Sequence, residues 1–139
     1  MKKAGIIISL CAAIIVFVAS CQTDQQIEYM RYYSGGQGLY TVNCQNCHGK
    51  NGEGLSALMP PLTDTAFISK NKDQLACYIK NGMTGMVKVS GKFYNNTMPP
   101  IELSPIEIAK VLTYVGNSFG NRVGLISLKD VENNLKNCK

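Results

Sequence analysis

Cys44-Gln45-Asn46-Cys47-His48 is the segment from which the architecture of this chain can be argued. The pattern C-x-x-C-H is typical of covalent haem attachment. Two thiols separated by two residues can meet the two vinyl groups on one porphyrin edge, and the next side chain then points its imidazole at the iron. The segment therefore predicts one covalent haem c, held by Cys44 and Cys47, with His48 as an axial ligand.

His48 is also the sole histidine of the 139 residues. A second axial ligand from this chain must therefore be a methionine or a lysine, unless that position stays open. A zinc site is disfavoured because it needs another ligand pair at similar spacing, and Cys77 and Cys138 stand alone. A thioredoxin-like dithiol would lie near a β-α-β pattern, and no strand pattern flanks Cys44.

The N-terminal residues indicate export. Lys2 and Lys3 precede an uncharged, apolar run over Ala4–Ala19, which is the pattern of a signal peptide. The run is shorter than the about 20 apolar residues that a spanning helix needs, so cleavage is favoured over an uncleaved anchor. Residues 18–21, Val-Ala-Ser-Cys, resemble a bacterial lipobox, which implies cleavage before Cys21 and its acylation. The alternative is an ordinary signal peptide with an incidental cysteine.

These features divide the chain into four parts. We expect a lipoprotein signal peptide over residues 1–20, a lipidated cysteine and a short extended tether over 21–32, a haem domain over 33–121 and a C-terminal extension with a short helix over 122–139. The domain would lie on the periplasmic side of a bacterial membrane. It would be small enough that the haem must form much of its core.

Of the six cysteines, one lies in the predicted signal peptide, one is the proposed lipid site and two are expected to hold the haem, which leaves Cys77 and Cys138. An exported location permits a disulfide between Cys77 and Cys138, although Cys77 would equally suit a small buried apolar position. The formal net charge is +5, and the basic residues are scattered along the chain. This distribution gives no argument for nucleic acid as a partner.

Hydrophobic spacing and capping signals predict a mainly helical chain. The expected helices are Gly36–Cys44, Lys72–Asn81 ended by Gly82, Ser104–Asn117, and a short tail helix with Ser127 as N-cap. The third is the clearest, because Ser-Pro-Ile-Glu supplies a capping box with proline in the first turn. Residues 85–96 fit a small hairpin or an irregular loop.

The chain resembles the class I c-type cytochromes over about residues 33–121. Gly36-x-x-x-Tyr40-x-x-x-Cys44 is similar to the family's spacing where its N-terminal helix crosses its C-terminal one, and Val111 and Tyr114 occupy the partner positions. Residues 91–100, ending in Met-Pro-Pro, look like those of small single-haem cytochromes. The resemblance implies the cytochrome c fold, which is all-α with three to five helices wrapped around one covalently bound haem c. It also implies that the Pro60 carbonyl accepts a hydrogen bond from His48 Nδ1–H.

The sixth iron ligand is expected to be Met98. A thioether must approach the iron from the face opposite His48, and Met59 follows the histidine too closely despite its identical Met-Pro-Pro context. Met98 lies far enough along the chain to wrap the porphyrin edge, with two prolines stiffening its loop. Met83 and Met86 are more typical of packing, with either as the fallback ligand.

Methionine and histidine together raise the reduction potential relative to two histidines, and they leave no open position for a substrate. We therefore expect an electron carrier and not an enzyme, moving electrons from a quinol-oxidising complex to a terminal oxidase or reductase. One alternative is a cytochrome subunit dedicated to a single dehydrogenase or reductase. A haem enzyme or gas sensor with a labile Met98 is another.

Overall fold

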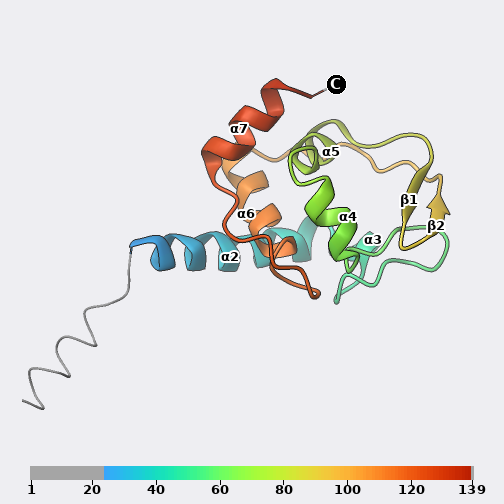
Figure 1. The fold of residues 1–139 in the computed structure, drawn as a ribbon, viewed down its shortest axis with the longest axis horizontal. Helices are drawn as coiled ribbons and strands as arrows, with labels where there is room; N and C mark the ends of the chain where they lie inside the picture. Colours follow the sequence, from blue (N-terminus) through green and yellow to red (C-terminus); the bar gives the residue numbers. More distant parts are fainter. Residues whose placement is uncertain (1–23, 139) are drawn as a thin grey trace, which may run out of the picture.

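The computed structural model describes residues 24–138, and Figure 1 shows how its elements are arranged. This part of the chain forms α2 (Asp24–Asn43), α3 (Gln45–His48), α4 (Thr65–Lys70), α5 (Leu75–Asn81), β1 (Val87–Val89), β2 (Lys92–Tyr94), α6 (Pro105–Val115) and α7 (Leu128–Lys136). The strands pair antiparallel, with Val87 opposite Tyr94. The protein is mainly helical, as expected.

The described residues contain six helices, whereas three to five were expected. The short helices α3 and α4 account for the difference. They have four and six residues, which is too short for hydrophobic periodicity to distinguish them from loops. The region expected to form a hairpin or loop contains the β1–β2 hairpin.

Helix α2 begins well before the expected position. The extended backbone expected for the tether is wrong over residues 24–32, because the chain is helical from Asp24. Tyr29 stacks on Tyr33 one turn later, and the Tyr33 hydroxyl lies 2.9 Å from that of Ser118. The first turns of α2 project beyond α6 in Figure 1. The predicted signal peptide and Cys21 lie outside the described residues.

The crossing of α2 and α6 organises the fold. Gly36 is buried there, and a Cβ at this position would collide with the Lys110 carbonyl and lie 2.8 Å from Tyr114 Cβ. Tyr40, Tyr114 and Phe119 form an aromatic cluster beside it, with ring centroids 5.3–5.7 Å apart. The two backbones can therefore approach closely because residue 36 has no side chain.

Capping boxes fix the start of both C-terminal helices. The Glu107 carboxylate accepts hydrogen bonds from the backbone N–H and hydroxyl of Ser104 at the start of α6, and Asp130 does the same for Ser127 at the start of α7. These bonds satisfy donors that a helix terminus leaves free. The expected caps are therefore both present.

Helix α7 packs against α6 and belongs to the same core. The Thr113 hydroxyl donates to the Ile126 carbonyl and accepts from the Ile126 N–H. Val131 is fully buried. The core is made of Tyr40, Ile68, Leu75, Ala76, Leu103, Ile108, Ala109, Val111, Leu112, Tyr114, Val115, Ile126 and Val131. Within residues 24–138 no helix has the length and apolar character needed to cross a membrane.

The crossing can be tested with two neighbouring glycines of α2. We expect Gly36→Ala to lower the free energy of unfolding by about 2 kcal/mol, because its methyl group would push the two helices apart. A Cβ added at Gly38 would have no heavy atom within 4 Å, so Gly38→Ala should raise stability by about 0.5–1 kcal/mol. Urea unfolding followed by circular dichroism measures both. Equal effects of the two substitutions would contradict a tight crossing at Gly36.

Candidate functional site

A largely apolar cavity lies between the haem-binding motif and the hairpin. It holds about 1130 Å³ of space, part of which is open to solvent. Its lining comes from every described element except α2 and α7, and from the loops between them: Cys44, Cys47, His48, Met59, Pro60, Pro61, Leu62, Phe67, Ile68, Leu75, Tyr78, Ile79, Met83, Gly85, Val87, Val89, Tyr94, Asn96, Thr97, Met98, Pro99, Val111, Leu112 and Val115. The predicted thiols, imidazole and thioether therefore share one cavity.

His48 is held in one orientation by the backbone. Its Nδ1 lies 3.0 Å from the Pro60 carbonyl oxygen, which can only accept, so Nδ1 carries the proton and Nε2 keeps a free lone pair. Burial lowers the pKa of the imidazole, and the bond to Pro60 opposes this shift. A neutral imidazole with Nε2 free is the form that ligates a metal.

The turn that carries His48 is fixed on both sides. The buried Tyr40 hydroxyl donates to the Gly49 carbonyl at 2.6 Å, and the Gly54 N–H donates to the His48 carbonyl at 2.8 Å. Gly54 has a φ of +72°, and a Cβ there would lie 2.8 Å from the Pro60 carbonyl carbon. The loop therefore places Pro60 against the imidazole only because residue 54 is glycine.

Cys44 precedes the single turn of α3 and Cys47 lies within it, and both are free thiols. Cys47 is exposed, whereas Cys44 is partly buried. Burial, with a smaller contribution from Cys47, raises the pKa of the Cys44 thiol to about 11. The two thiols reach the cavity from one short segment, as attachment to one porphyrin edge requires.

Met98 enters the cavity from a segment fastened to the end of α5. Its backbone N–H and carbonyl both pair with Met83, each at 2.9 Å. Gly82 ends α5 with a φ of +74°, and a Cβ there would lie 2.5 Å from the Met98 carbonyl oxygen. Met59 and Met83 also line the cavity, whereas Met86 is 71% exposed. Geometry therefore leaves three thioethers near the cavity.

The hairpin wall is attached to α4 through Asp64. One carboxylate oxygen accepts from the Phe67 N–H and caps α4, and the other accepts from the Ser90 N–H at 2.7 Å. These two backbone bonds lower the pKa of Asp64. Ser90 and Gly91 form the turn with positive φ, so the carboxylate fixes the tip of the hairpin whose Val89 and Tyr94 line the cavity.

Two positioning residues were missed in the sequence. Asp64 precedes α4 as an N-cap, a signal that could have indicated the helix but not its bond to Ser90. The buried Asn121 donates to the carbonyls of Leu62 and Val115, each at 2.9 Å. It thereby ties a cavity wall to α6. Both connections span parts of the chain too distant for a local pattern to reveal.

The residues present fit a covalent haem. The cavity offers two thiols, one imidazole with Nε2 free, and thioethers from other segments, in a lining that contains no Asp, Glu, Lys or Arg. Within residues 24–138 no three His, Cys, Asp or Glu side chains gather where they could bind a metal ion directly. The donor set therefore suits an iron that arrives inside an apolar porphyrin, and it does not suit a bare ion.

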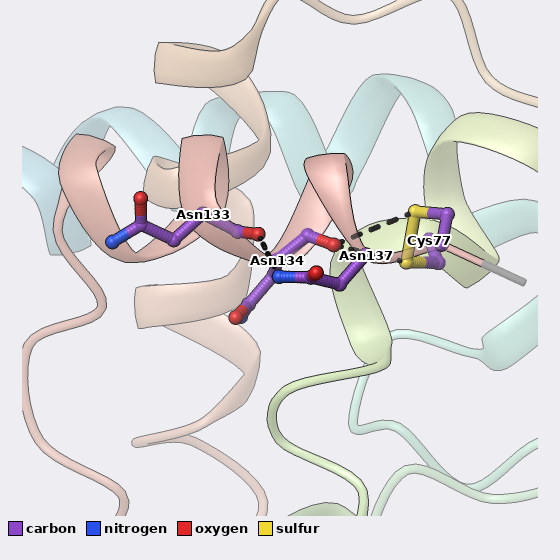
Figure 2. Close-up of a disulfide and its surroundings, with 5 residues drawn as sticks. Cys77, Asn133, Asn134 and Asn137 are labelled. Carbon is purple, nitrogen blue, oxygen red and sulfur yellow. Dashed lines mark hydrogen bonds between the residues drawn. A yellow bond between two sulfur atoms is a disulfide. The ribbon is translucent and has the colours of Figure 1, made fainter.

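Cys77 and Cys138 lie away from the cavity and form a disulfide, with their Cα atoms 5.5 Å apart (Figure 2). Cys77 is also buried, so this residue both forms the disulfide and occupies a small buried position. The sulfur atoms lie 3.6 and 3.7 Å from the Asn134 carbonyl oxygen, contacts drawn as dashed lines in Figure 2. They are not hydrogen bonds, because a sulfur atom in a disulfide carries no hydrogen.

A helical fold around such a cavity defines a haem-binding class of protein, and comparison with known proteins identifies the family. The cytochrome c family model matches residues 33–118, so the chain belongs to the cytochrome c family. Covalent haem c is the cofactor of this family and of this chain.

Curated relatives agree with that assignment. Cytochrome c-552 of Thermus thermophilus is 30% identical over 85 residues, a match that covers 58% of this chain and 65% of the relative. The protein of the same name from strain ATCC 27634 of that species is also 30% identical, with 57% of its length covered. The chain thus spans less than two thirds of the length of these relatives.

The role of Asp64 leads to a pH-dependent prediction. Since its folded-state pKa is lowered, its contribution to stability is present above the usual aspartate pKa of about 3.9 and is lost as pH falls through the folded value. We expect Asp64→Asn to cost about 1 kcal/mol at pH 7 and progressively less below pH 4. Thermal unfolding across this range measures the difference, with Asp73→Asn as an exposed aspartate control. A cost that stays constant with pH would contradict this role.

Proposed function

We propose that this protein is a single-haem electron carrier in which His48 and Met98 bind the iron from opposite sides. When bound, haem c supplies one-electron chemistry at its iron. Cys44 and Cys47 hold the porphyrin by thioether bonds, and Pro60 keeps the imidazole in the ligating tautomer. The observation that carries the proposal is the convergence of these side chains on one apolar cavity.

Electron transfer is favoured over substrate chemistry by the residues of the cavity. A complete axial pair leaves no position for a substrate on the metal. The lining holds no carboxylate, Lys or Arg and no second histidine, so none of these groups is placed there to act as a general acid or base. An enzyme or gas sensor with a labile Met98 would need such a group or an open position.

Exposed apolar side chains lie beside the cavity and suit contact with another redox protein. Leu55 and Leu58 are 51% and 53% exposed. The Leu58 carbonyl accepts a hydrogen bond from the Asn96 side chain, which lines the cavity. Leu58 therefore lies at the edge of the proposed haem site. We propose a quinol-oxidising complex as donor and a terminal oxidase or reductase as acceptor. Co-purification with a single dehydrogenase or reductase would instead favour a dedicated subunit.

Two observations support a periplasmic, lipid-anchored location. The leader and the lipobox-like Val-Ala-Ser-Cys precede the domain in the sequence. Independently, the Cys77–Cys138 bond is of a kind that persists in oxidising compartments. We propose that Cys21 carries the lipid and that the domain faces the periplasm.

The axial pair is tested by two methionines in the same Met-Pro-Pro context. We expect Met98→Ala to abolish the weak near-infrared band of sulfur-to-iron ligation and to lower the reduction potential, because the thioether stabilises the reduced iron. Met59→Ala should leave both unchanged. Absorption spectroscopy and redox titration of the holoproteins decide the assignment. Loss of the band in Met59→Ala alone would assign the ligand to Met59 and overturn this model.

The lipid anchor is tested at the proposed acylation site. In a bacterial host, we expect the wild-type chain to incorporate labelled palmitate and to fractionate with membranes. Cys21→Ala should lose the label, while Cys138→Ala should retain it. Label in the Cys21→Ala protein, or none in the wild type, would contradict lipidation at this residue.

A further inference from the structure

The Cys77–Cys138 disulfide joins the segment after α7 to α5, next to which the Met98 segment is hydrogen-bonded. Cys77 is the third residue of α5 (Leu75–Asn81) and is buried. Cys138 follows α7, so the bond links α5 to the C-terminal helix. Figure 2 shows the bond lying between these two helices. Neither cysteine of this disulfide lines the cavity.

The C-terminal end of α5 and the residues just after it hold the Met98 segment by three backbone hydrogen bonds. Two of them pair Met83 with Met98, and the third runs from the Ile101 N–H to the Ile79 carbonyl, all at 2.9 Å. Gly82 fits against the Met98 carbonyl with no space for a Cβ. A movement of α5 would therefore carry the thioether with it.

Helix α5 has weak support of its own. It has seven residues, and its N-cap, Gln74, makes no side-chain capping bond. A helix of this length is marginal without tertiary contacts. The position of α5 therefore depends on the burial of Leu75 and Ala76 and on the covalent bond at Cys77.

The partner of that bond is firmly placed. Ile126, two residues before α7, is fixed to α6 by two hydrogen bonds with Thr113, and Val131 within α7 is fully buried. Its start is closed by the Ser127–Asp130 capping box. The disulfide therefore ties a weakly supported helix to one that is anchored in the core.

We propose that Cys77 and Cys138 are positioning residues for the sixth iron ligand, their disulfide holding α5 where its C-terminal end keeps Met98 on the iron. This inference rests on the proposed function, because it takes Met98 to be the ligand. The disulfide takes no part in electron transfer and stays oxidised throughout. Its role is to limit how often the thioether leaves the metal.

The test measures how easily imidazole displaces the thioether from the ferric holoprotein. Apparent affinity for a competing ligand scales with the fraction of molecules whose binding position is open. We expect Cys138→Ser to bind imidazole about tenfold more tightly than the wild type, a factor of ten in the open fraction. The near-infrared sulfur-to-iron band should weaken at temperatures at which circular dichroism still reports a folded protein.

A control separates positioning from general loss of stability. Tyr33→Phe removes the hydrogen bond to Ser118 between α2 and the segment after α6, a bond that involves neither α5 nor α7. It should lower the unfolding temperature while leaving imidazole affinity at the wild-type value. Should Cys138→Ser not fold, wild-type holoprotein can be reduced with a thiol, capped by methylthiolation and reoxidised at the iron. The thioether links to haem survive this treatment.

The outcomes distinguish the two proposals. If Met98→Ala abolishes the near-infrared band while Cys138→Ser and the capped wild type bind imidazole like the untreated protein, the positioning role is wrong and the electron-carrier model stands. If Met98→Ala leaves the band unchanged, the ligand assignment itself fails. Equal increases in imidazole affinity for Cys138→Ser and Tyr33→Phe would also overturn the positioning role.

Discussion

The close approach of α2 and α6 at Gly36 sets the geometry on which the rest of the protein depends. Helix α2 leads directly into Cys44 and the turn of α3, and α6 supplies Val111, Leu112 and Val115 to the cavity wall. If the two backbones were held further apart, the haem-binding motif would be displaced from the wall that must pack against the porphyrin. The absence of a side chain at Gly36 therefore helps to set the width of the cavity, whose first lining residue, Cys44, lies about two helical turns further along the chain.

The two Met-Pro-Pro segments that contribute to the cavity lining have a common construction. Gly54 and Gly82 each have a positive φ, and each lies against the carbonyl of a Met-Pro-Pro methionine, Met59 and Met98 respectively. Each methionine also pairs with an earlier residue through an isolated β-bridge. The Leu55–Met59 bridge closes a short loop just before Pro60, whose carbonyl accepts from His48. The Met83–Met98 bridge instead joins the two segments that flank the β1–β2 hairpin.

The features that could be predicted from the sequence are those encoded by short, local patterns. The haem-binding motif, the Ser104 and Ser127 caps and the Gly82 helix end each occupy a few consecutive residues, and the caps and the helix end form as expected. The Asp64–Ser90 bond and the Met83–Met98 bridge could not be foreseen, because each joins residues that meet only after folding. The helical start of α2 was missed because residues 24–32 are mostly exposed, so no apolar stripe marks them as a helix.

The early start of α2 changes the mechanical picture of the molecule. A 20-residue helix is about 30 Å long, and its first turns stand clear of the globular body in Figure 1. If Cys21 carries a lipid, as proposed, the attachment point lies three residues before the first residue of α2. The haem-binding motif follows the opposite end of the same helix, so under that proposal the length of α2 would separate the haem from the lipid.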